Sequence, residues 1–394
     1  MGYRTYTCPI AKSCGGCEWL AVPYPIQLER KQRQVEELLG QMARQDGARI
    51  DPIAGMADPR AFRFKAATPF APGGKGGRRV RSGFYAAGSH RIVACERCLV
   101  EKEGLRALLN DVAAIAQRLG IAAYDEDAHA GLLRHAIARA GFATDDVLLT
   151  LVTREQRLPR ADELVDALVT AHPELTGIVQ NINGKRTNAM LGGTCRILWG
   201  SPIMHDALLG CVFAISSTSF YQTNPAQTEV LYRLALEGVE LAAGQRVLDA
   251  YCGCGTIGIC AAAQVDGLHV VGVERDAGGV AMARDNARAN AVEGRVRIER
   301  ADATVWMARA ARDGQRFDTV ILDPPRAGST PEFINACAAL SPNRVVYVSC
   351  NVATQARDLA LFRKKGYRLE RVSPVDMFPH TKHVETVALM SRDG

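Results

Sequence analysis

The stretch Val247-Leu-Asp-Ala-Tyr-Cys-Gly-Cys-Gly-Thr-Ile-Gly-Ile259 predicts a strand, a glycine-rich turn and the start of a helix. Gly253, Gly255 and Gly258 have the spacing G-x-G-x-x-G. Glycines in such a turn let the backbone approach a ligand closely. Glu274 closes the next predicted strand, where a carboxylate can accept hydrogen bonds from both ribose hydroxyls. The stretch therefore indicates a ligand that contains an adenosine ribose.

Two classes of enzyme use a turn of this kind. A dinucleotide-dependent oxidoreductase also requires the G-x-G-x-x-G spacing. Asp249, four residues before the first glycine, favours S-adenosylmethionine (SAM), because a carboxylate there can contact the methionine amino group but would repel a pyrophosphate. A tight strand-helix turn without a ligand is the structural alternative.

From about residue 226 onward, strands and helices are expected to alternate regularly. The five expected strands are Arg246–Ala250, His269–Glu274, Val296–Glu299, Thr319–Asp323 and Val345–Ser349, with helices such as Ala277–Asn290 and Thr354–Arg363 between them. This alternation predicts a parallel, doubly wound sheet, so the fold class is α/β with a Rossmann-like domain. Tyr367–Asp376 and Val384–Ser391 are close in the chain and predict a terminal antiparallel hairpin at one edge.

Three reactive side chains are expected near the ligand. Asp323 ends the fourth strand and begins Asp-Pro-Pro-Arg-Ala-Gly, where the prolines fix the backbone at the crevice. Cys350 follows the next strand, where a thiolate can act as a nucleophile. Glu385 begins the last strand and can act as a general base, and His380 and His383 are the alternatives for that role.

Two further parts are expected ahead of this domain, which spans residues 226–394. Residues 1–55 contain three cysteines in a segment without hydrophobic periodicity, followed by a helix from about Pro25 to Met42. Residues 56–225 contain mostly short β-like runs separated by turns, which predicts a mixed α+β domain.

Composition excludes several classes of protein. A chain of 394 residues that is 47% hydrophobic has enough apolar residues for two or three domains, so it is neither disordered nor a small disulfide scaffold. The apolar stretch Ala207–Ile215 is shorter than the ~20 residues of a membrane span. The Met-Gly-Tyr-Arg start lacks the apolar region of a secretory leader, so we expect a cytoplasmic protein without membrane contact.

Positive charge is concentrated in the first quarter of the chain. Residues 1–100 contain 16 Lys/Arg and 8 Asp/Glu, a net +8, which leaves −2 for the rest of a chain whose net charge is +6. Eight basic residues and no acidic one lie between positions 60 and 91, interleaved with aromatic residues: Arg60, Arg63, Lys65, Lys75, Arg78, Arg79, Arg81 and Arg91. Such a segment suits a surface that neutralises phosphates and stacks bases. A solvated basic hairpin is the alternative interpretation.

Motifs in the chain resemble those of the RNA uracil-5 methyltransferases, in the same order. They are Phe220-Tyr-Gln-Thr-Asn, Leu248-Asp-Ala-Tyr-Cys-Gly, Asp323-Pro-Pro-Arg-Ala-Gly, Ser349-Cys-Asn and Phe378-Pro-His-Thr-Lys-His-Val-Glu-Thr-Val. Arg63-Phe-Lys and Gly83-Phe-Tyr-Ala-Ala-Gly-Ser-His also resemble the central RNA-contacting domain of that family. The resemblance covers nearly the whole chain.

The resemblance implies SAM-dependent methylation of C5 of a uridine in RNA. Because uracil C5 is a poor nucleophile, Cys350 would add to C6 and so create an enolate, and Glu385 would then remove the C5 proton. The implied cofactor contacts are Gln222, Tyr251, Thr256, Glu274, Asp302 and Asp323. Thr256 departs from the asparagine that many members have at this position.

Twelve cysteines in a reducing compartment favour metal ligands, nucleophiles or buried small side chains over disulfides. Cys8-x5-Cys14-x2-Cys17 is separated by 77 residues from Cys95-x2-Cys98, a distance too long for a common zinc ribbon but tolerated by iron–sulfur clusters. The family resemblance implies a [4Fe-4S] cluster on Cys8, Cys14, Cys17 and Cys98, with Cys95 as the alternative fourth ligand. We expect it to fold the N-terminal segment against the basic domain. The remaining cysteines are expected to be buried: Cys195, Cys211, Cys252, Cys254, Cys260 and Cys337.

The resemblance also suggests the RNA that is modified. Because the first cluster cysteine is residue 8, we expect no N-terminal oligonucleotide-binding barrel. Cluster-bearing members without that barrel mostly resemble 23S rRNA enzymes, so 23S rRNA is the expected substrate, uridine 54 of the tRNA T-loop the alternative, and a monomer the expected state. An NAD-dependent oxidoreductase would not account for Cys350 and Glu385. A non-catalytic iron–sulfur RNA-binding protein would be expected to have lost one of them.

Overall fold

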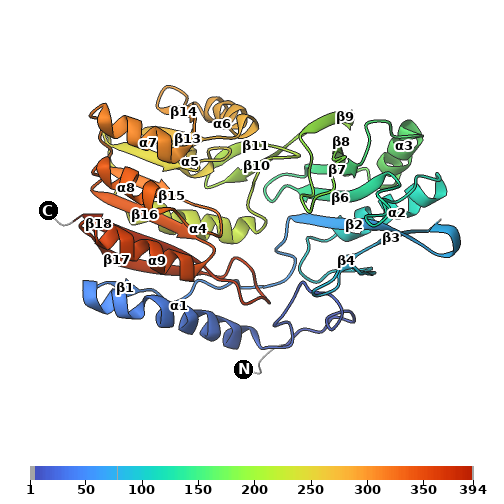
Figure 1. The fold of residues 1–394 in the computed structure, drawn as a ribbon, viewed down its shortest axis with the longest axis horizontal. Coiled ribbons are helices and arrows are strands. Elements are labelled where there is room, and N and C mark those ends of the chain that lie inside the picture. The colour runs from blue at the N-terminus through green and yellow to red at the C-terminus, as the bar shows by residue number, and fades with distance from the viewer. Residues whose placement is uncertain (1–4, 78, 393–394) are drawn as a thin grey trace.

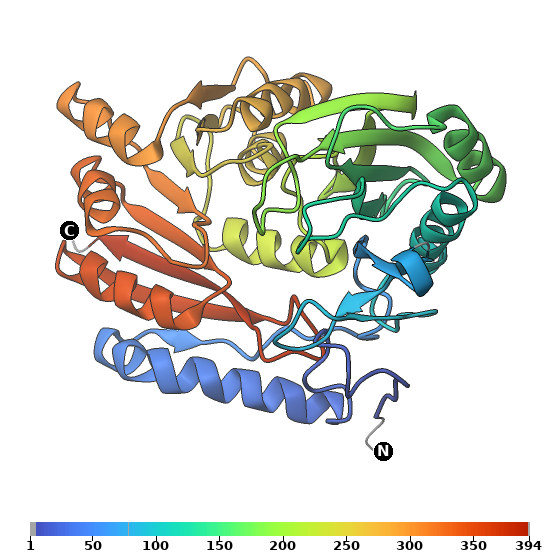
Figure 2. The same cartoon turned by 45° about the vertical axis from the view of Figure 1, so that its right-hand side comes forward.

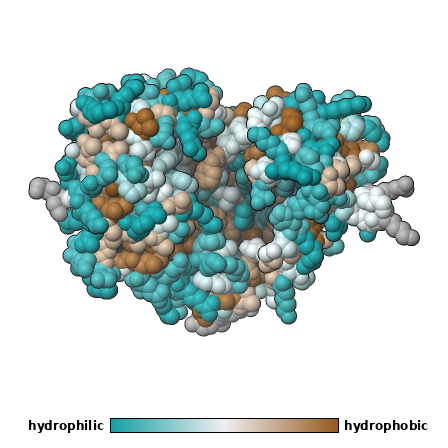
Figure 3. Space-filling view, in the orientation of Figure 1, coloured by the Kyte–Doolittle hydropathy of each residue, from teal (hydrophilic) through white to brown (hydrophobic). Residues whose placement is uncertain are grey.

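The computed structural model describes residues 5–77 and 79–392, so Arg78 of the predicted basic segment, like residues 1–4 and 393–394, lies outside the described residues. The side chain of Lys75 is not described either. In this part of the chain two lobes face each other, one built on an eight-stranded sheet and the other on a six-stranded sheet (Figure 1). The surface between the lobes is hollowed (Figure 3).

The larger sheet has the order β1-β17-β18-β16-β15-β12-β13-β14. Its strands are Arg49–Ile50 (β1), Arg246–Ala250 (β12), His269–Glu274 (β13), Val296–Arg300 (β14), Thr319–Leu322 (β15), Arg344–Ser349 (β16), Tyr367–Val375 (β17) and Glu385–Arg392 (β18). All run in one direction except β18, which is antiparallel to β16 and β17. The predicted parallel sheet and terminal hairpin are confirmed, but the hairpin is not at the edge of the sheet, because the two-residue strand β1 pairs outside β17. The carboxyl ends of the parallel strands point toward the other lobe (Figure 1).

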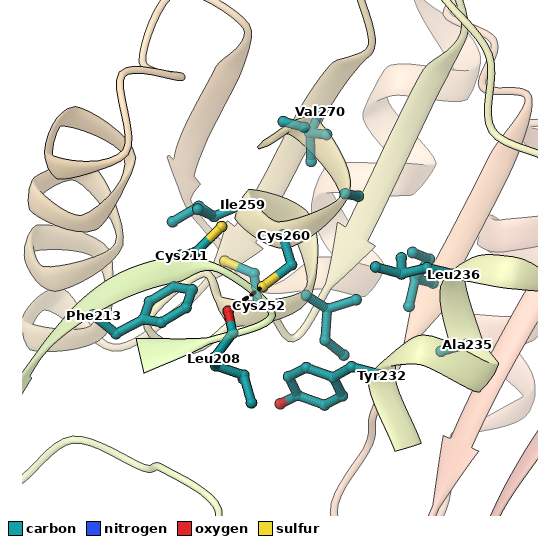
Figure 4. Close-up of a cluster of buried hydrophobic side chains, with 14 of the residues drawn as sticks. Leu208, Cys211, Phe213, Tyr232, Ala235, Leu236, Cys252, Ile259, Cys260 and Val270 are labelled. Atoms are coloured by element: carbon teal, nitrogen blue, oxygen red, sulfur yellow. Dashed lines mark hydrogen bonds between the residues drawn. The ribbon is translucent and has the colours of Figure 1, made fainter. Parts of the chain in front are cut away.

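Helices cover both faces of this sheet, as the hydrophobic strands require, because a parallel strand buries side chains on both sides. One face carries Pro225–Glu237 (α4), Thr256–Gln264 (α5), Ala277–Ala289 (α6) and the hairpin Ile203–Leu208 (β10) and Cys211–Ser216 (β11). The other carries Tyr24–Asp46 (α1), Ala303–Arg312 (α7), Pro331–Ala339 (α8) and Val352–Arg363 (α9). Successive residues alternate between the two cores, Val247 in the first and Leu248 in the second. Figure 4 shows the first core, where Cys211, Cys252 and Cys260 pack near Phe213.

The helix and strand from the start of the chain lie at the edge of the larger sheet. β1 pairs in parallel with β17, with Arg49 opposite Arg371. α1 lies beside α9 (Figure 2), and Arg363 of α9 forms an ion pair with Asp46 at 2.7 Å. Residues 24–50 of the predicted N-terminal segment are therefore part of the lobe that contains the glycine-rich turn.

The smaller sheet has the order β3-β2-β6-β7-β8-β9. Its strands are Lys65–Gly73 (β2), Arg79–Ser82 (β3), Leu133–Ala140 (β6), Val147–Thr153 (β7), Leu175–Ile182 (β8) and Thr194–Gly200 (β9). The 3-10 turn Lys75–Gly77 (η1) lies between β2 and β3. The short strands Phe84–Tyr85 (β4) and Ile92–Val93 (β5) follow β3 and pair with each other. Leu105–Arg118 (α2) and Ala161–Ala171 (α3) pack on one face. This is the mixed α+β arrangement that the short β-like runs predict.

One cysteine prediction is wrong. Cys195 is exposed, because β9 is the outer strand of the smaller sheet, whereas the other five cysteines expected in the core are buried. Among the helices of the described ranges, none combines the length and the apolarity that a membrane crossing requires.

Candidate active site

The glycine-rich turn joins β12 to α5 at the end of the larger sheet that faces the other lobe. Gly253 and Gly255 have φ angles of 55° and 85°, in the left-handed region that favours glycine, and Tyr251 shares that region with a φ of 67°. The Gly258 N–H donates to Asp249 Oδ2 at 2.9 Å, and a Cβ at Gly258 would lie 3.0 Å from the same oxygen. Glycine at this position therefore lets the helix pack directly over the Asp249 carboxylate.

A narrow pocket lies beside the turn. It is lined by four of the six predicted cofactor contacts, namely Gln222, Tyr251, Thr256 and Asp323. The same pocket is lined by Asp249 and by Phe220, whose ring is 71% exposed. The chain thus brings the segment 220–222, the glycine-rich turn and the end of β15 together around one space.

The two remaining predicted contacts lie next to this pocket. Glu274 Oε2 accepts a hydrogen bond from the Gly253 N–H at 3.1 Å, so the end of β13 holds the turn. Asp302 caps α7 by accepting from the Val305 N–H at 3.1 Å. Glu274 is the last residue of one parallel strand and Asp302 follows the next, which is why the strand pattern alone could place both carboxylates at this edge.

Three acidic groups near the pocket are hard to ionise. Burial raises the pKa of Asp249 to about 7, and it raises the pKa of Asp323 to about 7 as well. Burial, with a contribution from Asp323, raises the pKa of Glu385 to about 8. A cation placed among these carboxyl groups would favour their ionised forms, so the pocket suits a positively charged ligand.

Cys350 and Glu385 face each other across two antiparallel strands. Ser349 of β16 and Thr386 of β18 are the last pair of the ladder, and Cys350 and Glu385 are the next residues beyond it on the two chains. Glu385 is close enough to Cys350 to raise the pKa of its thiol. The sheet therefore places a thiol and a carboxyl group side by side at the edge of the pocket.

Arg326 is a functional candidate that sequence reasoning missed. Burial raises the pKa of the Cys350 thiol, and the nearby Glu385 raises it further, whereas a hydrogen bond from Arg326 lowers it. Arg326 also contacts His383, with Nη2 3.1 Å from Nδ1. The signal was present in the sequence, because Arg326 lies three residues after Asp323 in the same motif.

The two histidines proposed as alternative bases differ in their surroundings. His380 is buried, with Nδ1 3.2 Å from Gln27 Nε2 and Nε2 2.9 Å from the Pro59 carbonyl oxygen. Both of its ring nitrogens are therefore engaged in holding the loop, which leaves neither free to remove a proton. His383 lies beside Arg326 instead.

Comparisons with known proteins agree on one family. Residues 210–393 match the family model described as tRNA (Uracil-5-)-methyltransferase. The chain is 40% identical to an uncharacterized RNA methyltransferase of Halalkalibacterium halodurans, over 97% of this chain and 82% of that protein. It is 38% identical to an uncharacterized RNA methyltransferase of Staphylococcus aureus strain N315, over 98% of this chain and 83% of that protein.

The chain belongs to the RNA uracil-5 methyltransferase family. Its fold is also similar to the crystal structure of the Pyrococcus abyssi tRNA (uracil-54, C5)-methyltransferase in complex with S-adenosyl-L-homocysteine, with a TM-score of 0.77, 28% identity, and coverage of 98% of this chain and 87% of that one. This protein is therefore a SAM-dependent RNA uracil-5 methyltransferase. Both the oxidoreductase and the non-catalytic alternatives are excluded.

In this methyltransferase, helix α1 holds the loop that leads to Glu385. Lys31 Nζ lies 2.5 Å from Asp376 Oδ1 and donates to the Phe378 carbonyl oxygen at 3.0 Å, and Tyr24 donates to Asp376 Oδ2 at 2.8 Å. The Lys31 and Asp376 side chains are fully buried. Burial lowers the pKa of the Lys31 ammonium, and the Asp376 carboxylate opposes that effect.

Lys31→Met is expected to lower the free energy of unfolding by about 3–5 kcal/mol, because it leaves the Asp376 carboxylate buried without its cation. Urea unfolding of the two proteins measures this difference. The matched control is Lys382→Met, which removes the exposed ion pair between Lys382 and Glu18 and should change the value by less than about 1 kcal/mol. Equal losses in both variants would contradict the assigned role of Lys31.

Five cysteines of the methyltransferase converge on one cavity of about 400 Å³, where the N-terminal segment meets the smaller sheet: Cys8, Cys14, Cys17, Cys95 and Cys98. Thiolates are the ligands that iron–sulfur clusters use. Within residues 5–77 and 79–392, however, no three Cys, His, Asp or Glu side chains are grouped as a preformed metal site. The donor chemistry of the cavity fits a cluster, and the cluster itself stays a prediction.

The basic and aromatic residues of the predicted RNA-binding segment, residues 60–91, are only partly exposed. Arg79 and Arg81 of β3 are exposed, but Lys65 lies inside, where burial lowers its pKa to about 8. Of the interleaved aromatic residues, Phe62 and Phe70 are buried, and Phe64 and Phe84 are half-buried. Tyr85 is the exposed member of the aromatic set among the described residues.

Proposed function

We propose that Cys350 and Glu385 carry out the methylation of uracil C5 in this enzyme. The observation that supports the assignment is the position of Cys350 and Glu385 just beyond the last β16–β18 pair, close to each other and to Asp323 of the pocket. The exposed ring of Phe220 lines the same pocket and is available to stack on a uracil.

In the proposed reaction the Cys350 sulfur adds to uracil C6, and the electron pair of the C5–C6 double bond moves into an enolate that includes C5. SAM supplies an electrophilic methyl group. The enolate carbon C5 would form the new bond to that methyl as the methyl–sulfur bond breaks, with the thioether S-adenosylhomocysteine as the leaving group, and C5 would keep its own hydrogen until the next step. Glu385 takes this proton, the double bond reforms, and the sulfur of Cys350 leaves C6.

The raised pKa of Glu385 suits a base in this role. A carboxyl group with a pKa of about 8 binds a proton far more strongly than an exposed one, and it is still partly ionised at neutral pH. Arg326, which donates to the Cys350 sulfur, stabilises the thiolate against the repulsion from Glu385.

The proposed holders of SAM are Gln222, Tyr251, Thr256, Glu274, Asp302 and Asp323. Thr256 differs from the asparagine of many members, and its hydroxyl lies 3.0 Å from the hydroxyl of the buried Tyr232. The Thr256 hydroxyl therefore already has a hydrogen-bond partner in the protein. Of the six proposed SAM contacts, we expect the one from Thr256 to be the weakest.

Binding of SAM should strengthen with pH more than binding of S-adenosylhomocysteine does. The Asp249, Asp323 and Glu385 carboxyl groups have pKa values of about 7, 7 and 8, so they are largely protonated at pH 6 and ionise as the pH rises to 8. Only SAM has a cationic sulfur to attract the ionised groups, and the ratio of the two Kd values should change by about tenfold in its favour.

Isothermal titration of both ligands at pH 6 and pH 8 measures this ratio. The methionine amino group is common to the two ligands, so its own titration cancels. Asp323→Asn should flatten the pH dependence of SAM binding. An identical pH dependence for the two ligands in the wild-type enzyme would contradict the electrostatic assignment.

For the RNA substrate the proposal is a uridine of 23S rRNA. A second candidate, uridine 54 of tRNA, is favoured by the similarity to the Pyrococcus abyssi enzyme. Mapping 5-methyluridine in rRNA and tRNA from cells with and without the gene distinguishes them. Loss of 5-methyluridine from 23S rRNA in cells without the gene supports the first candidate. Loss from the tRNA T-loop shows instead that uridine 54 of tRNA is the substrate. If no RNA loses 5-methyluridine, the proposed function is wrong.

A [4Fe-4S] cluster on Cys8, Cys14, Cys17 and Cys98 is part of the same proposal, with a structural role. Burial raises the pKa of the Cys98 thiol, and hydrogen bonds from the Val100 and Glu101 backbone oppose that effect, whereas Cys95 Sγ donates to the Arg97 carbonyl oxygen at 3.1 Å. Hydrogen bonds from the backbone favour a thiolate, so Cys98 is the better fourth ligand.

Iron and sulfide analysis of protein purified without oxygen tests the cluster. Cys98→Ala should lose the iron, and Cys95→Ala should keep it. Protein without iron should bind RNA more weakly, because the N-terminal segment would no longer be held on the basic domain. Unchanged RNA affinity in the iron-free protein would contradict the structural role.

A further inference from the structure

A second large groove lies in the smaller lobe, away from the cofactor pocket. It has a volume of about 770 Å³ and is formed by β2 and β3, the turn between β4 and β5, residues 124–127, the start of β6 and residues 186–190. We call it the tyrosine groove, after Tyr85 and Tyr124, which line it. Met190 lines both this groove and the cysteine cavity, so the two spaces adjoin.

Aromatic and guanidinium planes form the walls of the tyrosine groove. The Tyr85 ring stacks on His90, with centroids 4.9 Å apart and an angle of 26°, and Tyr85 is 37% exposed. The Arg134 guanidinium lies over the Tyr124 ring at 4.6 Å. Flat surfaces of this kind bind nucleobases by stacking.

Two buried nitrogen atoms in the groove lack a hydrogen-bond partner within the described part of the chain. They are Arg134 Nε and His135 Nδ1. Arg134 is only 5% exposed, and its Nη1 donates to the Asn183 and Lys185 carbonyl oxygens at 2.5 and 2.8 Å. The guanidinium is therefore fixed in place while its Nε remains unsatisfied, which is costly unless a ligand supplies an acceptor.

The charges in the groove favour a nucleobase over a bare phosphate. Three arginines line it, Arg81, Arg134 and Arg186, but so do three acidic residues, Asp125, Glu126 and Asp127. Burial, together with the neighbouring Arg134, lowers the pKa of His135 to about 4, so this imidazole is neutral at physiological pH. A groove whose charges balance has little net attraction for a polyanion, whereas donors and acceptors together match the edge of a base.

Two exposed arginines outside the groove lining are available for phosphates. Arg79 and Arg91 are exposed, and each is close in sequence to a groove residue, Arg81 and His90 respectively. Their side chains can neutralise the backbone on either side of a bound nucleotide.

We propose that the tyrosine groove binds an unpaired nucleotide of the substrate RNA, with its base against Tyr85 and its edge on Arg134 and His135. The proposal rests on the proposed function, since it takes RNA as the substrate. A base in a duplex cannot enter, because both its faces are already stacked, so the groove selects RNA with a single-stranded segment near the target uridine.

Fluorescence anisotropy with a labelled 12-nucleotide single strand and the corresponding 12-base-pair duplex tests the groove. Tyr85→Ala and Arg186→Ala, both at exposed positions, should weaken binding of the single strand about tenfold and leave duplex binding unchanged. Tyr85→Phe should retain binding, since it keeps the ring. Arg118→Ala, an exposed arginine on α2, is the matched control and should bind both probes like the wild type.

Wild-type affinity for the single strand in Tyr85→Ala would overturn the proposal, and so would equal losses for single strand and duplex. Methyl incorporation separates this result from a failure of the proposed function. If the wild type methylates RNA and Tyr85→Ala keeps the same KM for RNA, the groove assignment falls and the function stands. If the wild type methylates no RNA, the function falls, and the anisotropy comparison still decides the groove.

Discussion

Cys350→Ala is expected to lower kcat for RNA methylation by on the order of 10⁴-fold or more, because it removes the nucleophile that we propose makes uracil C5 reactive. The loss should appear in kcat, not in binding. The side chain is half-buried beside the pocket and is not among the proposed holders of SAM, so the Kd for SAM should stay within about twofold of the wild-type value. Single-turnover methyl incorporation and isothermal titration measure the two quantities.

Cys195→Ala is the matched control for this substitution. Cys195 is an exposed cysteine on β9, in the other lobe, and its loss should leave kcat unchanged. If Cys350→Ala kept normal turnover, covalent addition to C6 through this residue would be wrong, whatever the effect on RNA binding.

Glu385→Gln should lower turnover by roughly 10²–10⁴-fold and leave methylated RNA attached to the protein. Glutamine has the size of glutamate but cannot take the C5 proton, so the reaction would stop after methyl transfer with Cys350 still bound to C6. A band that resists denaturation and contains both labelled methyl and RNA reveals the adduct, and peptide mapping places it on Cys350.

Two further variants make the result decisive. Glu332→Gln changes an exposed glutamate in the first turn of α8 and should neither slow turnover nor trap RNA. The double variant with Cys350→Ala should form no adduct. If Glu385→Gln released its product normally, another group would be the base. His383 would then be the next candidate, because both nitrogens of His380 are engaged.

The sequence allowed the catalytic lobe to be predicted closely because its strands are continuous hydrophobic runs that end in polar motifs. Strand limits at Arg246–Ala250 and His269–Glu274 agree with the structure. The same pattern put the Cys350 and Glu385 positions at one end of the sheet, and the antiparallel register then set them opposite each other.

Other features could not be predicted because they depend on contacts distant in the chain. β1 has two residues, too few for any pattern, and it is recognisable only through its partner β17. The partners of Lys31 are more than 340 residues away in sequence, at Asp376 and Phe378. Arg134 and His135 lie within a strand without a motif, and their unsatisfied nitrogens appear only once the groove around them is known.

The pairing of β1 with β17 has a consequence for how the protein is made. β1 can pair with the sheet only after Arg371, the partner of Arg49, has been synthesised, and Lys31 can form its ion pair only after Asp376 has been synthesised. During synthesis at the ribosome, the segment with Cys8, Cys14 and Cys17 and the helix α1 that follows it would leave the exit tunnel long before their partners exist. Such long-range closure is slow and leaves an apolar helix face uncovered meanwhile. We therefore expect the nascent chain to depend on chaperones, and Glu385, the proposed general base, to be held in place only when nearly the whole polypeptide has been translated.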